Sequence, residues 1–456
     1  MVNRTDTAII KLWGNTVGAV SWLDESAWSV FEFDSGFLKE GLEISPLHMS
    51  LEAARSGDGL FSFPALNKET FRGLPGLLAD ALPDKFGNSI INSWLIRQGR
   101  DSADFNPVER LCYTGKRGMG ALEFQPAITE EYDDSVPVEI SELVSITQTI
   151  TKERMSLDVQ LSSSEQENNE AILDILRVGT SAGGARPKAV IAMDNEGHVR
   201  SGQTEAPAGY DYWVLKLDGV TDLELGKPKE YGRIEYAYYL MSKAAGINMT
   251  ECRLLEENGR AHFMTKRFDR INGEKVHVQS LCGLAHYDFN LPGAYSYEEA
   301  FGVMRKLRLT KSEAAEQYRR MVFNIIARNQ DDHTKNISYL MGAEGKWNLS
   351  PAYDVMYAHN PAGKWTNQHQ MTVNGKRDHV SLKDLIAVGE SISLPRSEEI
   401  IDDIVSSVEK WPEYAMEAGL SQKRTLEISQ HHRTQILNSL ENEDENNGGG
   451  TPPPAF

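Results

Sequence analysis

The sequence predicts an α+β protein in which two β-rich segments precede a helical segment. Residues 8–33 alternate short apolar runs with turn residues, a pattern typical of antiparallel strands. A second series of predicted hairpins lies between residues 188 and 268. From Tyr297 onward, apolar residues recur at the spacing of a helix face.

The composition is that of a folded globular protein with several domains. The chain has 456 residues, of which 40% are hydrophobic and 25% charged. A formal net charge of -19 disfavours a large nucleic-acid-binding surface, because phosphate contacts need clustered Lys and Arg side chains. We expect a cytoplasmic protein, because residues 1–20 lack a signal-peptide pattern and no apolar run is long enough for a membrane span. The three widely spaced cysteines predict buried, reduced thiols.

The first part of the chain predicts a small sheet followed by helices. Turns are expected at Gly14-Asn15 and Asp24-Glu25, between the apolar runs of AIIKLWGNTVGAVSWLDESAWSVFEF. The segment GLPGLLADALPDKFGNS predicts helical structure interrupted at Pro83. Polar residues dominate 158–170, which we interpret as a linker near a domain boundary.

The later segments complete the predicted order of elements. Strands are expected in KAVIAM and YWVLKL, and in CRLL and AHFMTKRF around a turn at residues 257–259. Helices are expected in YEEAFGVMRKL and KSEAAEQYRRMVFNIIARN. We therefore predict a β-rich N-terminal subdomain (1–125), a small lobe with a glycine-rich loop (126–270), a helical large lobe (271–441) and a disordered acidic tail (442–456).

A pattern of chemistry-bearing residues follows the second long helix. In RNQDDHTKN, four residues separate Asp331 from Asn336, which is the spacing of the catalytic loop in protein kinases. There the Asp accepts the proton of the substrate hydroxyl, and the Asn binds Mg²⁺. Asp332 misses this spacing by one residue. A predicted hairpin then leads to SPAYD, where Asp354 would be the second ligand of a cation that prefers oxygen.

A glycine-rich segment lies upstream of this pattern. GTSAGGARPK places three glycines before Lys188 and a predicted strand, namely Gly179, Gly183 and Gly184. Backbone amides of such a loop can approach phosphate groups closely. The alternative interpretation is a hairpin loop that binds no ligand.

A strand lysine and a helix glutamate follow the glycine-rich segment. Lys216, within WVLKL, resembles the strand lysine of kinases that holds nucleotide phosphates. The next predicted helix offers Glu235 as the ion-pair partner of this lysine, with Glu230 as an alternative.

Each of these features also fits a structural role when it is taken alone. Asp331, Asp332 and His333 could cap a helix end, and Asp354 could be a turn residue. A transition-metal site is disfavoured, because consecutive loop residues point in different directions. The order of glycine loop, strand lysine, helix glutamate, catalytic loop and later Asp favours a kinase.

Several segments together resemble the HipA family of toxin kinases: GTSAGGARPKAVI, YWVLKL, TKRFDR, RNQDDHTKN and LSPAYD. The opening strands and GLPGLLADALPDKFG resemble the N-terminal subdomain of that family. The resemblance implies a kinase-like two-lobed fold, with a β-rich small lobe, a helical large lobe and a β-rich N-terminal subdomain. It also implies an ATP-dependent serine/threonine protein kinase that arrests growth by phosphorylating a cellular protein, for example an aminoacyl-tRNA synthetase.

The resemblance assigns roles to particular residues. It makes Asp331 the catalytic base and makes Asn336 and Asp354 the Mg²⁺ ligands. ATP contacts are expected from three places: the glycine-rich loop, the two strand lysines and a hinge near 266–268. The residues are Ser181, Gly183 and Gly184 of the loop, Lys188 and Lys216 of the strands, and Lys266 and Phe268 of the hinge. Ser181 is also the implied autophosphorylation site, because a phosphate in this loop would repel ATP; otherwise its hydroxyl serves a turn.

The implied partner is a HipB-type helix-turn-helix antitoxin, through which the acidic chain would reach DNA indirectly. Two other functions remain: a small-molecule kinase of the aminoglycoside phosphotransferase type, and a catalytically silent corepressor. The serine-bearing loop and the N-terminal subdomain favour the HipA type over the former. The sequence departs from ordinary protein kinases at Asn329, which replaces the His of HRD, and at AYDV, which replaces DFG.

Overall fold

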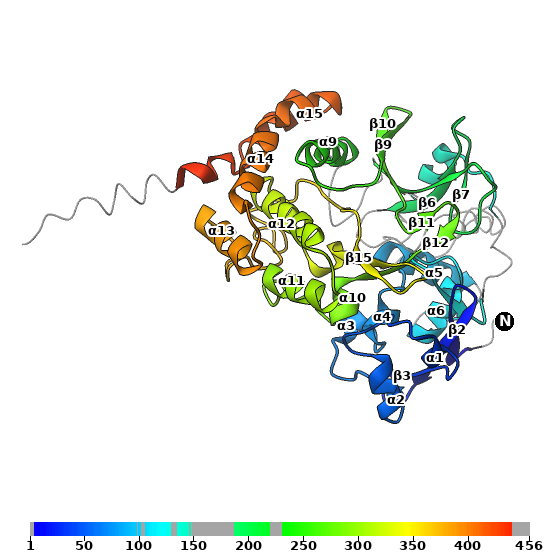
Figure 1. The fold of residues 1–456 in the computed structure, drawn as a ribbon. Coiled ribbons are helices and arrows are strands. Elements are labelled where there is room, and N and C mark those ends of the chain that lie inside the picture. Colours follow the sequence, from blue (N-terminus) through cyan, green and yellow to red (C-terminus); the bar gives the residue numbers. More distant parts are fainter. Residues whose placement is uncertain are drawn as a thin grey trace, which may run out of the picture. The chain divides into compact units, whose positions relative to one another are not determined.

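A computed structural model describes residues 4–97, 99–101, 105–128, 135–145, 147, 187–218 and 230–439 (Figure 1). The predicted linker 158–170, the glycine-rich segment 179–185 and the predicted tail 442–456 lie outside these residues. The chain divides into two compact units. The first comprises Met1–Tyr236, Thr250–Asn290 and Thr334–Pro351, and the second comprises Ala237–Met249, Leu291–His333 and Ala352–Phe456.

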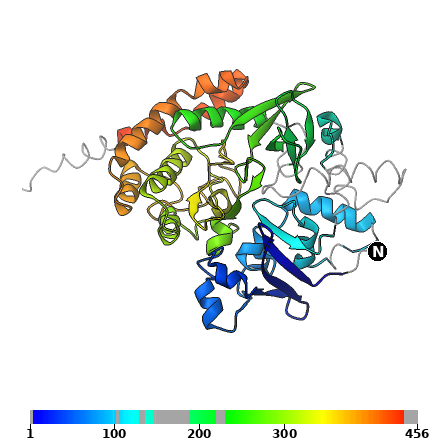
Figure 2. The same cartoon turned by 45° about the vertical axis from the view of Figure 1, so that its right-hand side comes forward.

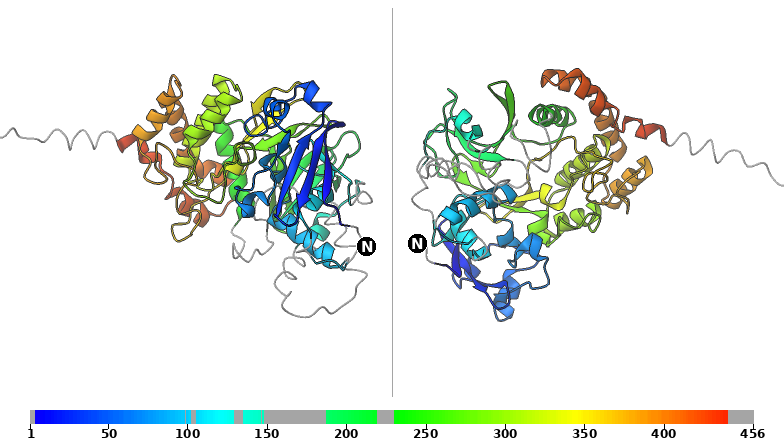
Figure 3. Two further views of the ribbon diagram at one scale, coloured as in Figure 1. Left: turned by 90° about the horizontal axis from the view of Figure 1, so that it is seen from below. Right: turned by 180° about the vertical axis from the view of Figure 1, so that it is seen from behind.

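The first unit opens with an antiparallel five-stranded sheet (Figure 3). Its order is β4-β3-β2-β1-β5, from β1 (Thr7–Leu12), β2 (Asn15–Leu23), β3 (Trp28–Phe33), β4 (Leu60–Phe61) and β5 (Leu122–Gln125). Alternate residues of β1 are buried, because successive side chains of a strand point to opposite faces. The predicted turn at Asp24-Glu25 is confirmed. The first turn lies one residue earlier than predicted, at Trp13-Gly14, where both residues have positive φ and Gly14 adopts it without strain.

Six helices of this unit follow or interrupt the first sheet. They are α1 (Phe37–Glu40), α2 (Leu51–Ser56), α3 (Lys68–Phe71), α4 (Gly76–Ala79), α5 (Lys85–Arg97) and α6 (Pro107–Thr114). Pro83 lies between α4 and α5, which confirms the predicted interruption. Asp84 begins α5, because its Oδ1 accepts a 2.6 Å hydrogen bond from the amide of Gly87.

A second antiparallel sheet contains the later predicted hairpins. Its order is β7-β6-β8-β10-β9, from β6 (Lys188–Met193), β7 (Val199–Ser201), β8 (Asp211–Lys216), β9 (Cys252–Glu257) and β10 (Arg260–Lys266). Asn258 and Gly259 both have positive φ, which allows the tight turn between β9 and β10. Two smaller sheets follow: β11 (Arg270–Ile271) with β12 (Glu274–Lys275), and β13 (His277–Ser280) with β14 (Ser338–Met341) and β15 (Trp347–Leu349).

The second sheet has one apolar face that packs against α5 (Figure 2). Buried apolar side chains of three neighbouring strands form this face with buried side chains of α5; they include Ala189, Ile191, Trp213, Leu215 and Met264 from the sheet and Ile90, Ile91, Trp94 and Leu95 from the helix. Since residues alternate along each strand, Lys188 and Lys216 belong to the opposite face. The core therefore fixes which face of the sheet carries the lysines.

Helix α9 (Tyr231–Ala244) begins against β10 at a distance that only glycine permits. A Cβ atom on Gly232 would lie 2.1 Å from the carbonyl oxygen of Ala261. Any larger residue at position 232 would push the start of the helix away from the strand. This close approach sets where the first turn of α9 presents its side chains.

Further short elements of the first unit include α10 (Leu281–Ala285) and the 3-10 helix Thr334–Asn336. The second unit contains the predicted helical segment: α11 (Tyr297–Lys306), α12 (Lys311–Ile326), α13 (Leu382–Ser391), α14 (Ser397–Glu409), α15 (Trp411–Glu417), α16 (Gln422–Ser429) and the 3-10 helix Thr434–Ser439. Ser296 and Thr310 start α11 and α12 with capping boxes, which satisfy otherwise unpaired amides. Within the described part of the chain, no helix is long and apolar enough to cross a membrane.

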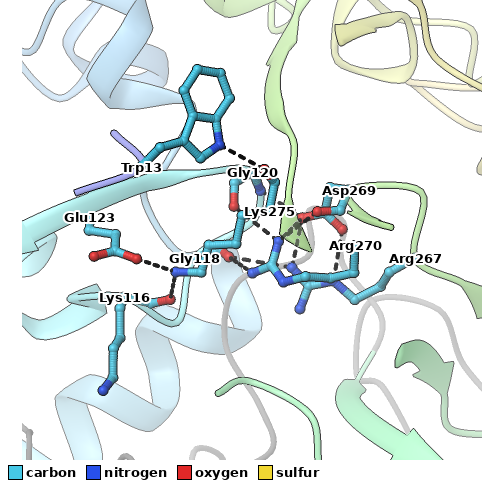
Figure 4. A network of polar contacts seen from close by, with 9 residues as sticks. All are labelled: Trp13, Lys116, Gly118, Gly120, Glu123, Arg267, Asp269, Arg270 and Lys275. Atoms are coloured by element: carbon cyan, nitrogen blue, oxygen red, sulfur yellow. Dashed lines mark hydrogen bonds and ion pairs between the residues drawn. The ribbon is translucent and has the colours of Figure 1, made fainter. Parts of the chain in front are cut away.

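A buried charge network joins the second sheet to the N-terminal subdomain (Figure 4). Asp269 receives two hydrogen bonds from Arg267, at 2.9 and 2.7 Å, and one of 2.9 Å from Arg270. Its carboxylate also accepts a 2.7 Å hydrogen bond from the amide of Gly120, just before β5. Arg270 in turn donates to the carbonyl oxygens of Gly118 and Gly120. The two arginines hold the pKa of Asp269 well below its usual range although burial opposes them.

We predict that Asp269→Asn lowers the free energy of unfolding by about 3–5 kcal/mol, because it leaves two buried arginines without their counter-ion. The matched control is Asp211→Asn, which removes the partner of the half-exposed Lys266 and should cost less than about 1 kcal/mol. Urea denaturation at pH 7 measures both variants. Because the folded pKa of Asp269 is depressed, its contribution is present above the unfolded pKa and is lost as the pH falls below it. Equal destabilisation by the two variants would contradict this account.

Candidate active site

Two lysines face each other across neighbouring strands of the second sheet. Lys188 of β6 is the register partner of Lys216 of β8, and Phe263 of β10 is the next residue in the same row. The ammonium of Lys216 lies 5.6 Å from the centroid of the Phe263 ring. Like charges directly opposite each other destabilise a sheet unless other groups balance them.

Each lysine has a buried carboxylate nearby. Lys216 forms an ion pair and hydrogen bond with Glu235 in the first part of α9. Glu235, and not the alternative Glu230, is therefore the glutamate that the fold pairs with this lysine. The Nζ atom of Lys188 lies 3.8 Å from Oδ2 of Asp84, and both side chains are almost completely buried.

The predicted hinge follows the end of β10. Lys266 shares its face of the sheet with Met264 and pairs with Asp211 through a 2.7 Å contact, so its side chain lies on the opposite face from Lys216. The amide of Arg267 donates to the carbonyl of Tyr212 at 2.8 Å, which continues the strand pairing by one residue. The structure thus brings Lys188, Lys216 and Glu235 together and leaves the Lys266 side chain apart from them. Phe268 directly follows Arg267.

In the second unit, the two adjacent aspartates of the predicted catalytic loop have different surroundings. Asp332 has only 1% of its side chain exposed and is bound by three groups. It accepts from Tyr297 Oη at 2.9 Å, from the amide of Gln370 at 2.7 Å and lies 3.0 Å from Nδ1 of His369. Asp331 keeps 42% of its side chain exposed. Asp332 is therefore fully engaged within the protein, and Asp331 is the more exposed of the two carboxylates.

Backbone hydrogen bonds hold the segment that carries Asp354 beside the segment that carries Asp331. The backbones of Asn329 and Ala358 form a parallel bridge, with hydrogen bonds of 3.0 Å from Gln330 to Ala358 and from Ala358 to Arg328. On its other side, Ala352 donates a 2.8 Å hydrogen bond to the carbonyl of Asn248. Asp354 itself has a φ of 52°, a strained conformation that aspartate tolerates better than most residues.

Groups around Asp331 shift the pKa of its carboxyl group in opposite directions. Desolvation by the surrounding protein raises the pKa of its carboxyl group, and the charges of Asp354 and Asp332 raise it further. His333, whose Nε2 lies 3.8 Å from Oδ1 of Asp331, and a 2.6 Å hydrogen bond from the indole of Trp365 act in the other direction. These neighbours act in opposite directions, and the net result is a raised pKa of Asp331.

Of the remaining predicted residues, Asn336 belongs to the first unit and the residues of the glycine-rich loop fall outside the described residues. Asn336 ends the 3-10 helix Thr334–Asn336 of the first unit. Ser181, Gly183 and Gly184 fall in residues that the structure does not describe. Within the described part of the chain, no group of three or more His, Cys, Asp or Glu side chains is arranged to hold a metal ion. A cation at Asp354 would consequently need amide, water or phosphate oxygens as further ligands.

Three residues of the groups described above, two in the first unit and one in the second, were not predicted from the sequence: Asp84, Gly232 and Trp365. Asp84 lies more than a hundred residues before Lys188, and no spacing connects the two. Gly232 looks like an ordinary helix residue until its contact with Ala261 is known. Trp365 occurs in GKWTNQHQ, a segment without a regular pattern, so its hydrogen bond to Asp331 depends on tertiary structure alone.

Comparison with known proteins places these features in a family. Residues 8–125 match the HipA N-terminal domain, and residues 180–412, half of the chain, match the HipA-like C-terminal domain. HipA from Shewanella oneidensis, solved in a toxin–antitoxin complex with HipB and operator DNA, superposes with a TM-score of 0.62 at 16% identity. The alignment covers 94% of this chain and 96% of that one.

A Helicobacter pylori proinflammatory kinase, CtkA, aligns with 54% of this chain and 94% of its own length, at 13% identity. Its TM-score of 0.32 is too low to support a conclusion. The full-length match to HipA confirms the predicted kinase-like α+β fold with a β-rich N-terminal subdomain. The chain therefore belongs to the HipA family, of which it carries both the N-terminal and the C-terminal domain.

Proposed function

We propose that this chain is an ATP-dependent serine/threonine protein kinase that acts as the toxin of a toxin–antitoxin pair. The observation that carries the proposal is the contrast between Asp331 and Asp332. One carboxylate is accessible and lies close to Asp354, while its neighbour is fully used in holding the loop. That is the arrangement a general base needs, because it must be fixed in place and still reach a hydroxyl proton.

Lys188 and Lys216, which we call the lysine row, are suited to bind the phosphates of ATP. Two ammonium groups on one face of a sheet, each with a carboxylate beside it, offer anion-binding groups whose positions are fixed before a nucleotide arrives. Lys216 would hold phosphate oxygens while Glu235 holds Lys216. The family resemblance implies that Asp354 and Asn336 would be the Mg²⁺ ligands, and their oxygens are of the type that Mg²⁺ prefers; its charge would neutralise the phosphates in the reaction.

Asp331 would accept the proton of a serine or threonine hydroxyl as that oxygen attacks the γ-phosphate. The other residues would mainly position the reactants and balance charge, which is where most of the catalysis in phosphoryl transfer comes from. No nucleophilic side chain of the protein is needed. An aminoacyl-tRNA synthetase is the kind of target that the family resemblance implies.

A HipB-type antitoxin is the partner we propose. The Shewanella oneidensis protein was solved with HipB and operator DNA. A net charge of -19 makes this chain poorly suited to bind DNA by itself, so the antitoxin would supply the basic surface. The cytoplasm is the compartment in which such a pair would act.

We predict that Asp331→Asn and Asp354→Ala each lower the transfer of phosphate from [γ-³²P]ATP by about a hundredfold or more, because they remove the general base and a cation ligand. Both variants should also lose the ability to arrest growth when they are expressed in bacteria without antitoxin. Their folds should persist, as measured by circular dichroism and thermal unfolding.

The matched control is Asp403→Asn in the same unit, which removes a mostly exposed carboxylate 3.3 Å from Arg319 and should leave transfer unchanged. Wild-type levels of labelled product in either site variant would refute the kinase assignment. Casein and an aminoglycoside panel, offered as acceptors, separate a protein kinase from a small-molecule kinase. Growth arrest that persists in both variants would favour a non-catalytic toxin.

We also predict that the wild-type chain gains one phosphate at Ser181 when it is incubated with ATP and Mg²⁺, and that its activity then falls. A doubly charged phosphate in the glycine-rich loop would repel the phosphates of ATP. Intact-mass spectrometry of wild-type protein and Ser181→Ala measures this gain. If Ser181→Ala gains the same phosphate, the modified residue lies elsewhere.

A further inference from the structure

Trp365 contacts the carboxylate of Asp331 directly. Its indole Nε1 donates a 2.6 Å hydrogen bond to Oδ1 of Asp331. An indole N–H can only donate, and an ionised carboxylate only accepts, so the contact is matched to the state in which Asp331 can take a proton. Hydrogen bonds to charged groups are shorter and stronger than those between neutral groups.

Trp365 is itself held in place by the loop that it belongs to. The side-chain amide of Gln370 donates to the carbonyl of Trp365 at 2.6 Å and to the carbonyl of Gln330 at 3.1 Å. The amide of Asn360 donates to the carbonyl of Thr366 at 2.9 Å, which closes the loop on its other side. The backbone that carries the indole is therefore held on both sides.

The same loop binds the neighbouring aspartate. His369 and the amide of Gln370 contact the two carboxylate oxygens of Asp332. Residues 365–370 thus contact both aspartates, one through the Trp365 side chain and the other through the end of the loop. Trp365 is only half-buried, and its ring lies 6.2 Å from that of His333, centroid to centroid. The indole and the His333 imidazole therefore flank the accessible carboxylate.

We propose that Trp365 is a positioning residue that fixes the rotamer of Asp331 through its indole N–H. With Oδ1 held by the indole, the carboxylate has one orientation, and its other oxygen is directed to the acceptor hydroxyl. This inference rests on the proposed role of Asp331 as the general base. It adds a determinant from residues 360–370, which the kinase-like motifs of the sequence do not include.

The test is Trp365→Phe, which removes the N–H and keeps an aromatic ring. Phosphate incorporation from [γ-³²P]ATP into the chain itself should fall about 10- to 100-fold at saturating MgATP, the effect of losing one hydrogen bond to a charged group. The MgATP concentration for half-maximal rate should stay the same, because the lysine row is untouched. Trp13→Phe is the matched control, since it loses a 2.7 Å indole hydrogen bond to the carbonyl of Lys275 far along the sequence.

Comparison with Asp331→Asn separates failure of this inference from failure of the kinase assignment. In the Asp331→Asn background, Trp365→Phe should cause no further loss. If Asp331→Asn is inactive while Trp365→Phe matches the wild type, the positioning role is wrong and the kinase assignment stands. If Asp331→Asn is active, the kinase assignment itself fails. A change confined to the half-maximal MgATP concentration would make Trp365 a nucleotide contact and overturn the inference.

Tryptophan emission gives a second measurement that needs no turnover. Asp331→Asn should shift the emission of the protein that retains Trp365 and leave the emission of Trp365→Phe unchanged, because the Trp365 indole is hydrogen-bonded to this carboxylate. Equal shifts in both backgrounds would contradict the contact. If Trp365→Phe fails to fold, the emission of the single variant Asp331→Asn still tests the inference. An emission identical to that of the wild type would overturn it.

Discussion

The buried carboxylate of Asp332 is the constraint on which the second unit's site depends. A carboxylate without contact to water must be satisfied by the protein, and here a tyrosine hydroxyl, a backbone amide and a histidine ring satisfy it. These groups come from the start of α11 and from residues 369 and 370, so one charge binds two distant segments to the end of α12. The contacts of Asp332 also determine the position of Asp331, the preceding residue. It is accessible because its neighbour points inward.

In the first unit, two lysines of the second sheet must be balanced by nearby carboxylates. Its second sheet places two ammonium groups in direct register on one face, an arrangement that costs free energy in isolation. The fold offsets this cost with Glu235 from α9 and Asp84 from the start of α5. One carboxylate thus comes from the kinase-like part and the other from the N-terminal subdomain. The subdomain therefore contributes to the surroundings of the lysine row as well as to the core beneath it.

Much of this fold could be predicted from local signals in the sequence. Alternation in residues 8–33, the Asn258-Gly259 turn and the helical period after Tyr297 each reflect short-range physics, and the corresponding elements formed as expected. The spacing that singled out Asp331 over Asp332 agrees with their different exposure.

What the sequence could not supply depends on tertiary contact. Local patterns do not reveal that Lys266 lies on the opposite face of the sheet from Lys216, because that follows from strand register. The donor to Asp331 comes from Trp365 in an irregular loop, and the counter-ion near Lys188 comes from a helix start about a hundred residues earlier. Charge balance in a buried site is a property of the assembled fold, so a motif search finds the lysines and misses what neutralises them.

The Arg267–Asp269–Arg270 network has a consequence for dividing the chain. Its partners on the other side are the backbone groups of Gly118 and Gly120, which belong to the segment that leads into β5. If the chain were cut after residue 125, the two arginines of the C-terminal fragment would lose these carbonyl acceptors. The carboxylate of the same fragment would lose the amide that donates to it. Supplied separately, the two fragments would be expected to recombine through this joint, as split proteins do when each half retains an unsatisfied complementary surface. The N-terminal subdomain is in this sense an integral part of the kinase-like fold and a poor candidate for independent expression.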